Sequence, residues 1–189
     1  MMKVFLWGES GFVASLLKKH FYDGDVGIQL IGRNNSCDYT IDILYDTSIP
    51  KDIDSNSVVF FLTAISSPDL CNDSTSVARK VNLINTKEII QKILDSGAIV
   101  IFFSSDLIYG DTEEECNERT LPQPNSNYSL WKFYIEDYFK KYENFKTLRL
   151  SYLCDLNDKF TSFLINCDRE QEIDVFHPFY RSMIHSDDF

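Results

Sequence analysis

The sequence predicts an α/β protein with a doubly wound parallel sheet, and three features of the chain support this fold class. Strand-like and helix-like segments alternate, which is the order of repeated βαβ units. The strand-like segments at residues 58–62 and 98–103 are unbroken apolar runs, as expected for strands buried on both faces. A chain of 189 residues, 44% of them hydrophobic, is long enough for one such domain with a core.

The first half of the expected sheet consists of short apolar runs separated by turns. A strand at residues 3–7 ends at Gly8, and apolar side chains at helical spacing predict a helix over residues 12–21. Three further strands are expected at residues 28–31, 39–44 and 58–62.

The second half begins with a long amphipathic helix expected over residues 76–96, for which Gly97 is the stop signal. A buried strand at residues 98–103 follows, and then a polar loop that contains two prolines. A helix is expected over residues 129–142 and a last strand at residues 147–150. After residue 151 the pattern loosens.

Composition excludes several classes of function. The net charge of −11 repels phosphate backbones and anionic lipid surfaces, so we expect neither nucleic acid nor a membrane as a partner. The five cysteines and three histidines have no metal-ligand spacing, so no metal site is predicted. With no signal segment and no disulfide pattern, we expect a cytoplasmic protein.

The turn after the first strand has the composition of a phosphate-binding turn. Glycines at this place allow a tight turn and let a pyrophosphate approach the N–H groups at the start of a helix. A glycine-rich turn alone is a weak signal, but its position at the first βα junction strengthens it. The candidate cofactor-binding residues here are Gly8, Ser10, Gly11, Phe12 and Val13.

The end of the second strand bears on the choice of cofactor. An acidic residue at this place binds the ribose 2′-hydroxyl of NAD, but here the strand is followed by Gly32 and Arg33. A guanidinium suits a 2′-phosphate, so the sequence favours NADP, with NAD as the alternative. The competing interpretation is that Arg33 is a solvated surface residue.

A tyrosine and a lysine stand four residues apart at the start of the expected helix over residues 129–142. Tyr128 and Lys132 therefore lie on one face, and a nearby cation would lower the pKa of the phenol. Ser105 directly follows the strand at residues 98–103, where it can hydrogen-bond a reacting oxygen. The alternative is that Tyr128 and Lys132 simply open a surface helix.

Taken together, these motifs resemble those of the extended short-chain dehydrogenases/reductases, the Rossmann-fold superfamily of nucleotide-sugar epimerases, dehydratases and reductases. Further matching landmarks are Thr63-Ala64, Val81-Asn82-x-x-x-Thr86, Ser104-Ser105-x-x-x-Tyr109-Gly110, Leu148-Arg149-Leu150 and Arg181-x-x-Ile184-His185-x-x-Asp188.

The resemblance implies roles for individual residues and a domain division. It implies a catalytic set of Asn82, Ser105, Tyr128 and Lys132. The further cofactor-binding residues that it implies are Asp42, Ile43, Thr63, Ala64, Tyr128 and Lys132, and the substrate-binding residues are Ser105, Asp106 and Arg181. Residues 1–153 would form the NADP-binding Rossmann domain and residues 154–189 the start of an apparently truncated substrate-binding region. A homodimer through the two long helices is also implied.

The sequence determines the activity within this superfamily less closely than the family itself. The resembled dehydratases have an acidic pair after the catalytic Ser or Thr, whereas here Asp106 is followed by Leu107, so dehydration lacks its base. The run from Ser104 to Tyr109 is most similar to that of dTDP-4-dehydrorhamnose reductases. We therefore expect a reductase of a nucleotide-linked keto sugar. The alternatives are an epimerase and a catalytically silent dinucleotide-binding protein.

Overall fold

The computed structural model describes residues 2–24, 26–73, 77–112, 115–156, 158–167, 172 and 182–189. The chain divides into two compact units, Met1–Arg149 and Leu150–Phe189, which are described one at a time. From the sequence, the boundary was expected a few residues later, after residue 153.

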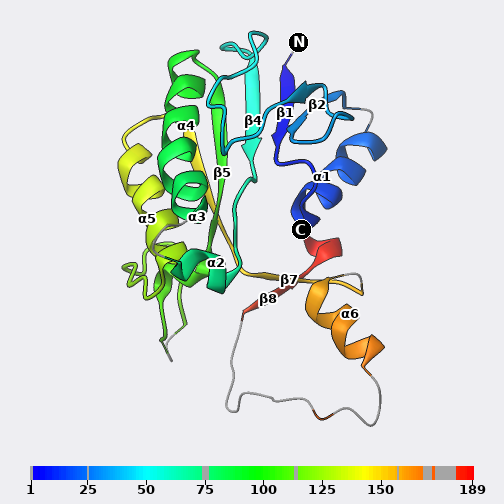
Figure 1. Cartoon of the computed structure of the whole chain (residues 1–189), viewed down its shortest axis with the longest axis vertical. Helices are drawn as coiled ribbons and strands as arrows, with labels where there is room; N and C mark the ends of the chain where they lie inside the picture. The colour runs from blue at the N-terminus through cyan, green and yellow to red at the C-terminus, as the bar shows by residue number, and fades with distance from the viewer. Residues whose placement is uncertain are drawn as a thin grey trace. The chain divides into compact units, whose positions relative to one another are not determined.

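A six-stranded sheet forms the centre of the first unit, with the strand order β3-β2-β1-β4-β5-β6 (Figure 1). The pairs β1–β2, β1–β4, β2–β3 and β4–β5 are parallel. The order reverses beside β1, which confirms the predicted doubly wound Rossmann topology. The strands are β1 Lys3–Trp7, β2 Ile28–Gly32, β3 Tyr39–Thr40, β4 Ser57–Phe61, β5 Ile99–Ser105 and β6 Phe145–Leu150.

Helices cover both faces of this sheet, as its apolar strands require (Figure 1). Phe21 of α1 packs edge-on against Phe60 on one face, with ring centres 5.5 Å apart. On the other face, Phe61 and Phe102 belong to the core that includes Ile90 of α4. The helices of this unit are α1 Phe12–Asp23, α2 Pro68–Asn72, α3 Val77–Arg79, α4 Thr86–Asp95 and α5 Asn127–Phe139, with a 3-10 helix η2 at Asp106–Tyr109.

The long helix expected over residues 76–96 contains a π-helical segment that the sequence did not reveal. This segment, η1, spans Lys80–Asn85 between α3 and α4. The hydroxyl of Thr86 donates to the Val81 carbonyl at 2.7 Å, five residues back. The wider turn buries Asn82 and Asn85, which a regular helix would space differently.

The strand expected over residues 39–44 is shorter than predicted. Only Tyr39–Thr40 pairs with β2, because the Asp42 carboxylate accepts a hydrogen bond from Leu44 N at 2.9 Å and begins a turn. Ile41 and Ile43 remain buried beyond the end of the strand.

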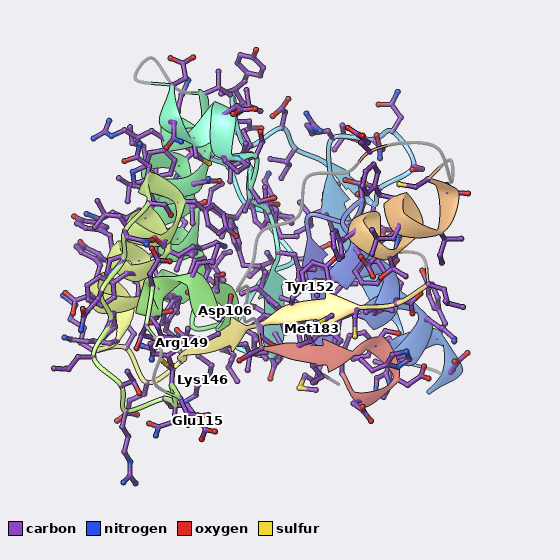
Figure 2. All side chains as sticks on the ribbon, turned by 90° about the horizontal axis from the view of Figure 1, so that it is seen from below. Asp106, Glu115, Lys146, Arg149, Tyr152 and Met183 are labelled. Atoms are coloured by element: carbon purple, nitrogen blue, oxygen red, sulfur yellow. The ribbon has the colours of Figure 1, made fainter. Side chains whose placement is uncertain are left out.

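The second unit contains a small parallel pair and one helix. β7 Tyr152–Cys154 pairs with β8 Met183–His185, and Tyr152 and Met183 are register partners (Figure 2). Asp158 caps α6 Lys159–Asn166 by accepting hydrogen bonds from Phe160 N and Thr161 N at 2.8 and 3.0 Å. The 3-10 helix η3 Ser186–Asp188 follows β8.

We expect Gly110 to be irreplaceable in the turn after η2. Its φ of 71° lies in the left-handed region, and a Cβ atom there would collide with the Gln123 carbonyl oxygen. Gly110→Ala should therefore lower the free energy of unfolding by at least ~1–2 kcal/mol, measured by urea denaturation followed by tryptophan fluorescence. Gly27, which has open space where a Cβ would lie, is the control. Equal stability of Gly110→Ala and Gly27→Ala would contradict this account.

Candidate functional site

The glycine-rich turn after β1 lies close to the loop after β4. Gly8 has a φ of 102°, and a Cβ atom there would lie 2.7 Å from Thr63 Oγ1 and 2.8 Å from Thr63 N. α1 then starts at Phe12, and its N-cap, Gly11, makes no side-chain capping hydrogen bond. The turn and this helix N-terminus together form a cradle of the kind that binds pyrophosphate.

Glu9, in the same turn, is a site residue that the sequence analysis missed. Its side chain is buried at the end of β2, where Oε1 accepts hydrogen bonds from Asn34 Nδ2 at 2.7 Å and Cys37 Sγ at 3.3 Å. Oε2 is buried and has no hydrogen-bond partner among the described residues. The carboxylate fits here because Gly32 has no side chain: a Cβ would lie 2.9 Å from the Glu9 carboxyl carbon.

Arg33, the expected ligand of a 2′-phosphate, directly follows β2 and is exposed. In the described part of the chain its guanidinium makes no hydrogen bond or ion pair. The end of β2 therefore presents an exposed cation next to a buried carboxylate, where the sequence indicated only the cation.

Two buried asparagines of η1 hold the loops that carry four of the expected cofactor-binding residues. The Asn82 amide accepts from Ile65 N at 2.8 Å and donates to Ile65 O at 2.7 Å, which fixes the loop of Thr63 and Ala64. Asn85 Nδ2 donates to the Ile43 carbonyl at 2.5 Å and so fixes the segment of Asp42 and Ile43. These contacts give Asn82 a positioning role, and its expected catalytic role stays a prediction.

Lys132 points into the sheet from the second turn of α5. A capping box between Ser126 and Ser129 fixes the start of this helix. Lys132 is buried, and its Nζ donates to the Phe103 carbonyl of β5 at 2.5 Å. Burial lowers the pKa of Lys132 to about 7, and the charge of Glu136 only partly opposes this shift.

The phenol of Tyr128 behaves differently from what the sequence predicted. The Lys132 Nζ lies 5.8 Å from the centre of the Tyr128 ring, so the two residues do share one face of α5. The pKa of Tyr128 is nevertheless raised, to about 12, by burial and by the charges of Cys71 and Asp106. The expected lowering is therefore wrong, because burial disfavours the charged phenolate.

Two serine hydroxyls lie at the carboxyl end of β5. Ser105 Oγ donates to Asp106 Oδ1 at 3.1 Å and accepts from Leu107 N at 3.2 Å, so it also caps η2. Within the part of the chain that the structure describes, Ser104 Oγ is buried without a hydrogen-bond partner, a feature that the sequence did not suggest. Arg181, the third expected substrate-binding residue, lies outside the described residues.

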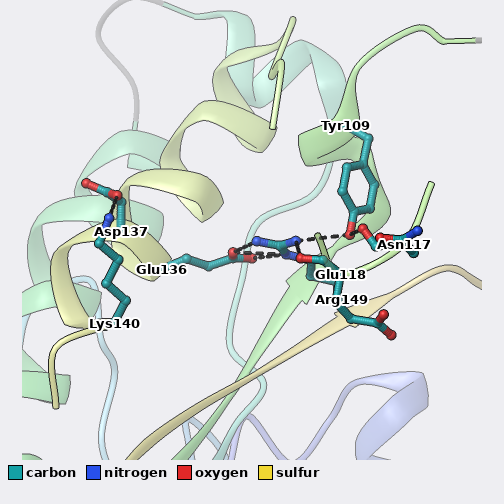
Figure 3. Close-up of polar contacts among 7 residues, drawn as sticks. All are labelled: Tyr109, Asn117, Glu118, Glu136, Asp137, Lys140 and Arg149. Atoms are coloured by element: carbon teal, nitrogen blue, oxygen red, sulfur yellow. Dashed lines mark hydrogen bonds and ion pairs between the residues drawn. The ribbon is translucent and has the colours of Figure 1, made fainter. Parts of the chain in front are cut away.

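An ion pair anchors the far end of α5 beside β6 (Figure 3). Arg149 Nη2 and Nε lie 2.8 and 3.1 Å from Glu136 Oε2, and Nη1 donates to the Tyr109 hydroxyl at 3.0 Å. The Tyr109 hydroxyl in turn donates to the Asn117 carbonyl at 2.8 Å. Glu136 follows Lys132 by one helical turn, so this network sets the orientation of the face that carries Tyr128 and Lys132.

Comparison with known proteins assigns the chain to a family. Residues 4–154 match the sequence model of the NAD dependent epimerase/dehydratase family. The chain belongs to this family. This membership confirms the resemblance to the extended short-chain dehydrogenases/reductases. It also makes a nicotinamide dinucleotide the expected type of cofactor. No curated protein sequence matches it significantly.

Solved structures similar to this family member support its fold. A Thermotoga maritima UDP-glucose 4-epimerase matches with a TM-score of 0.78 at 20% identity, covering 98% of this chain and 70% of that chain. A Bacillus cereus UDP-glucuronic acid 4-epimerase, solved with UDP-glucuronic acid and NAD, matches with a TM-score of 0.77 at 19% identity and the same coverages. Within the described residues, no helix is long and apolar enough to span a membrane.

Lys132 should give the stability of this protein a distinctive pH dependence. Its pKa is about 7 in the fold and ~10.4 in an unfolded chain, so the unfolded state binds more protons between these values. The free energy of unfolding should therefore rise from pH 7 to pH 9.5 relative to Lys132→Met, as measured by urea denaturation at each pH. Tyr128 is present in both proteins, so its own titration cancels. Parallel pH profiles would mean that Lys132 stays charged in the fold.

Proposed function

We propose that this chain supplies the dinucleotide site and the acid–base residues of a reductase acting on the keto group of a nucleotide-linked sugar. The observation that carries the proposal is that Tyr128 and Lys132 share one face of α5, beside the end of β5 that carries Ser105. The family assignment supports a nicotinamide dinucleotide as the redox partner. Whether the proposed site prefers NAD or NADP depends on the residues at the end of β2.

The residues present fit a bound dinucleotide. The absence of a side chain at Gly8 lets the turn pack closely against Thr63, and the N-terminus of α1 follows directly after this turn. Glu9 Oε2 and Ser104 Oγ are buried polar atoms without hydrogen-bond partners in the described ranges. We assign the pyrophosphate to the turn of residues 8–13 and the reacting end to the neighbourhood of Ser105, Tyr128 and Lys132. When bound, the cofactor supplies a hydride to the sugar carbon.

Tyr128 is suited to donate the accompanying proton. With a pKa raised to about 12, its phenol is protonated at neutral pH. Reduction of a keto group consumes one hydride at carbon and one proton at oxygen, and we assign this proton to the Tyr128 hydroxyl. Ser105 orients the same oxygen by donating a hydrogen bond in place of the one it gives Asp106. Lys132 stabilises the phenolate that remains until solvent restores the proton.

A 4-epimerase is the second candidate, because the family whose sequence model matches includes epimerases. Epimerisation begins with oxidation, so Tyr128 would first have to accept a proton from a sugar hydroxyl. The run from Ser104 to Tyr109 is most similar to that of the reductases, which is why we place the reductase first.

Tyr128→Phe tests the proposed chemistry. It removes only the hydroxyl, so turnover of a nucleotide-linked 4-keto sugar, followed by loss of reduced-nicotinamide absorbance, should fall by ~10²-fold or more. Dinucleotide affinity should be almost unchanged. Tyr134→Phe, on an exposed part of the same helix, is the matched control and should retain full turnover.

Other outcomes separate the alternatives. Equal turnover of Tyr128→Phe and the parent protein would overturn the proposed role of this residue. Interconversion of two UDP-sugars without net consumption of reduced nicotinamide would identify an epimerase. Dinucleotide binding without turnover of any such sugar would identify a silent binding protein.

The homodimer implied by the family resemblance is proposed to use the outer faces of η1, α4 and α5. Ile84 and Tyr134 are exposed there, and Lys87 Nζ lies 3.7 Å from the centre of the Tyr138 ring. Ile84→Asp should convert the dimer to monomer in analytical ultracentrifugation, since it places a charge in an apolar contact. A parent protein that is monomeric at the same concentration would contradict this proposal.

A further inference from the structure

We infer that Glu9 makes the site selective for NAD over NADP, because its carboxylate occupies the position at the end of β2 where the adenosine ribose binds. This inference rests on the proposed dinucleotide site and concerns only which form of the cofactor that site accepts. It reverses the preference that Arg33 suggests in the sequence.

The position of Glu9 follows from the sheet and from two glycines. Gly8 N donates to the Ile31 carbonyl at 2.8 Å, which holds the glycine-rich turn against the last residues of β2. Gly32 ends β2 and leaves room for the Glu9 carboxylate. In this topology the dinucleotide crosses the carboxyl ends of the strands beside β1, and the residue at the end of β2 meets the ribose. Glu9 thus brings an acid to this place from the turn instead of from the strand.

The carboxylate of Glu9 has one oxygen with hydrogen-bond donors and one oxygen without a donor among the described residues. Asn34 and Cys37 both donate to Oε1, and their contacts hold the carboxylate in place. No described residue donates a hydrogen bond to the buried Oε2, although buried oxygens are nearly always hydrogen-bonded. The hydroxyl groups of a ribose diol donate hydrogen bonds and would satisfy Oε2. A 2′-phosphate offers only acceptor oxygens at neutral pH and carries negative charge.

The cations near Glu9 do not neutralise its carboxylate. Lys18 Nζ donates to the backbone carbonyl of Glu9 at 3.0 Å, and no ion pair among the described residues includes Glu9. Arg33 is exposed, so its attraction for a phosphate is screened by water, whereas the repulsion from a buried carboxylate is not. The repulsion between the Glu9 carboxylate and the 2′-phosphate should therefore make the site prefer NAD over NADP.

Calorimetric titration of the full chain with NADH, NADPH, ADP-ribose and 2′-phospho-ADP-ribose tests this inference. The parent protein should bind NADH at least tenfold more tightly than NADPH, and ADP-ribose at least tenfold more tightly than its 2′-phosphate. Glu9→Gln keeps the size and the acceptor for Asn34 but removes the charge, so it should narrow both ratios to about threefold or less. Arg33→Ala, the matched control at the same strand end, should leave the preference for NADH in place.

The outcomes distinguish this inference from the function on which it rests. A parent protein that prefers NADPH, with the preference lost in Arg33→Ala, would overturn the role of Glu9 and leave the dinucleotide site intact. Because this result concerns the parent protein, it counts even if Glu9→Gln fails to fold. Failure of all four ligands to bind would overturn both the inference and the proposed dinucleotide site.

Discussion

The loops that leave the carboxyl edge of the sheet have backbone groups that must be hydrogen-bonded, and side-chain amides meet this requirement. The Asn82 amide accepts a hydrogen bond from Ile65 N and donates one to Ile65 O after β4, and Asn85 donates to the Ile43 carbonyl after β3. Both asparagines belong to the π-helical segment. An irregular turn in one helix therefore fixes two loops of the candidate site. At the opposite edge of the sheet, Asn144 likewise donates a side-chain hydrogen bond to a backbone carbonyl, that of Ala98, at 2.8 Å.

A second organising feature is the row of alternating charges associated with α5. Lys132 is buried against the Phe103 carbonyl, Glu136 follows one turn later, and Arg149 of β6 pairs with Glu136. Burying one amine alone would cost more than a hydrogen bond to a carbonyl returns. The carboxylate of Glu136 reduces that cost, and Arg149 in turn prevents Glu136 from remaining an unpaired buried charge. The reactive face and the helix anchor are thus parts of one electrostatic arrangement.

Sequence reasoning succeeded where one physical rule dominated a segment. The apolar run of residues 3–7 became β1 without change, and the helix expected over residues 129–142 matches α5 to within a few residues. It failed where tertiary contacts decided the result. No local pattern predicts the π turn around Asn82, and Asp42 ended β3 through a hydrogen bond that apolar periodicity ignores. The direction of the Tyr128 pKa shift depended on burial, which spacing alone does not reveal.

The space beside Gly32 couples two positions of this chain. A methyl group at position 32 would collide with the Glu9 carboxyl group, whereas a smaller residue at position 9 would remove that conflict. A side chain at position 32 would therefore push the end of the flexible Glu9 side chain out of its place, so the position of this carboxylate depends on the glycine. The two positions are thus coupled: the acid keeps its place at the end of β2 only while the residue twenty-three positions later has no side chain.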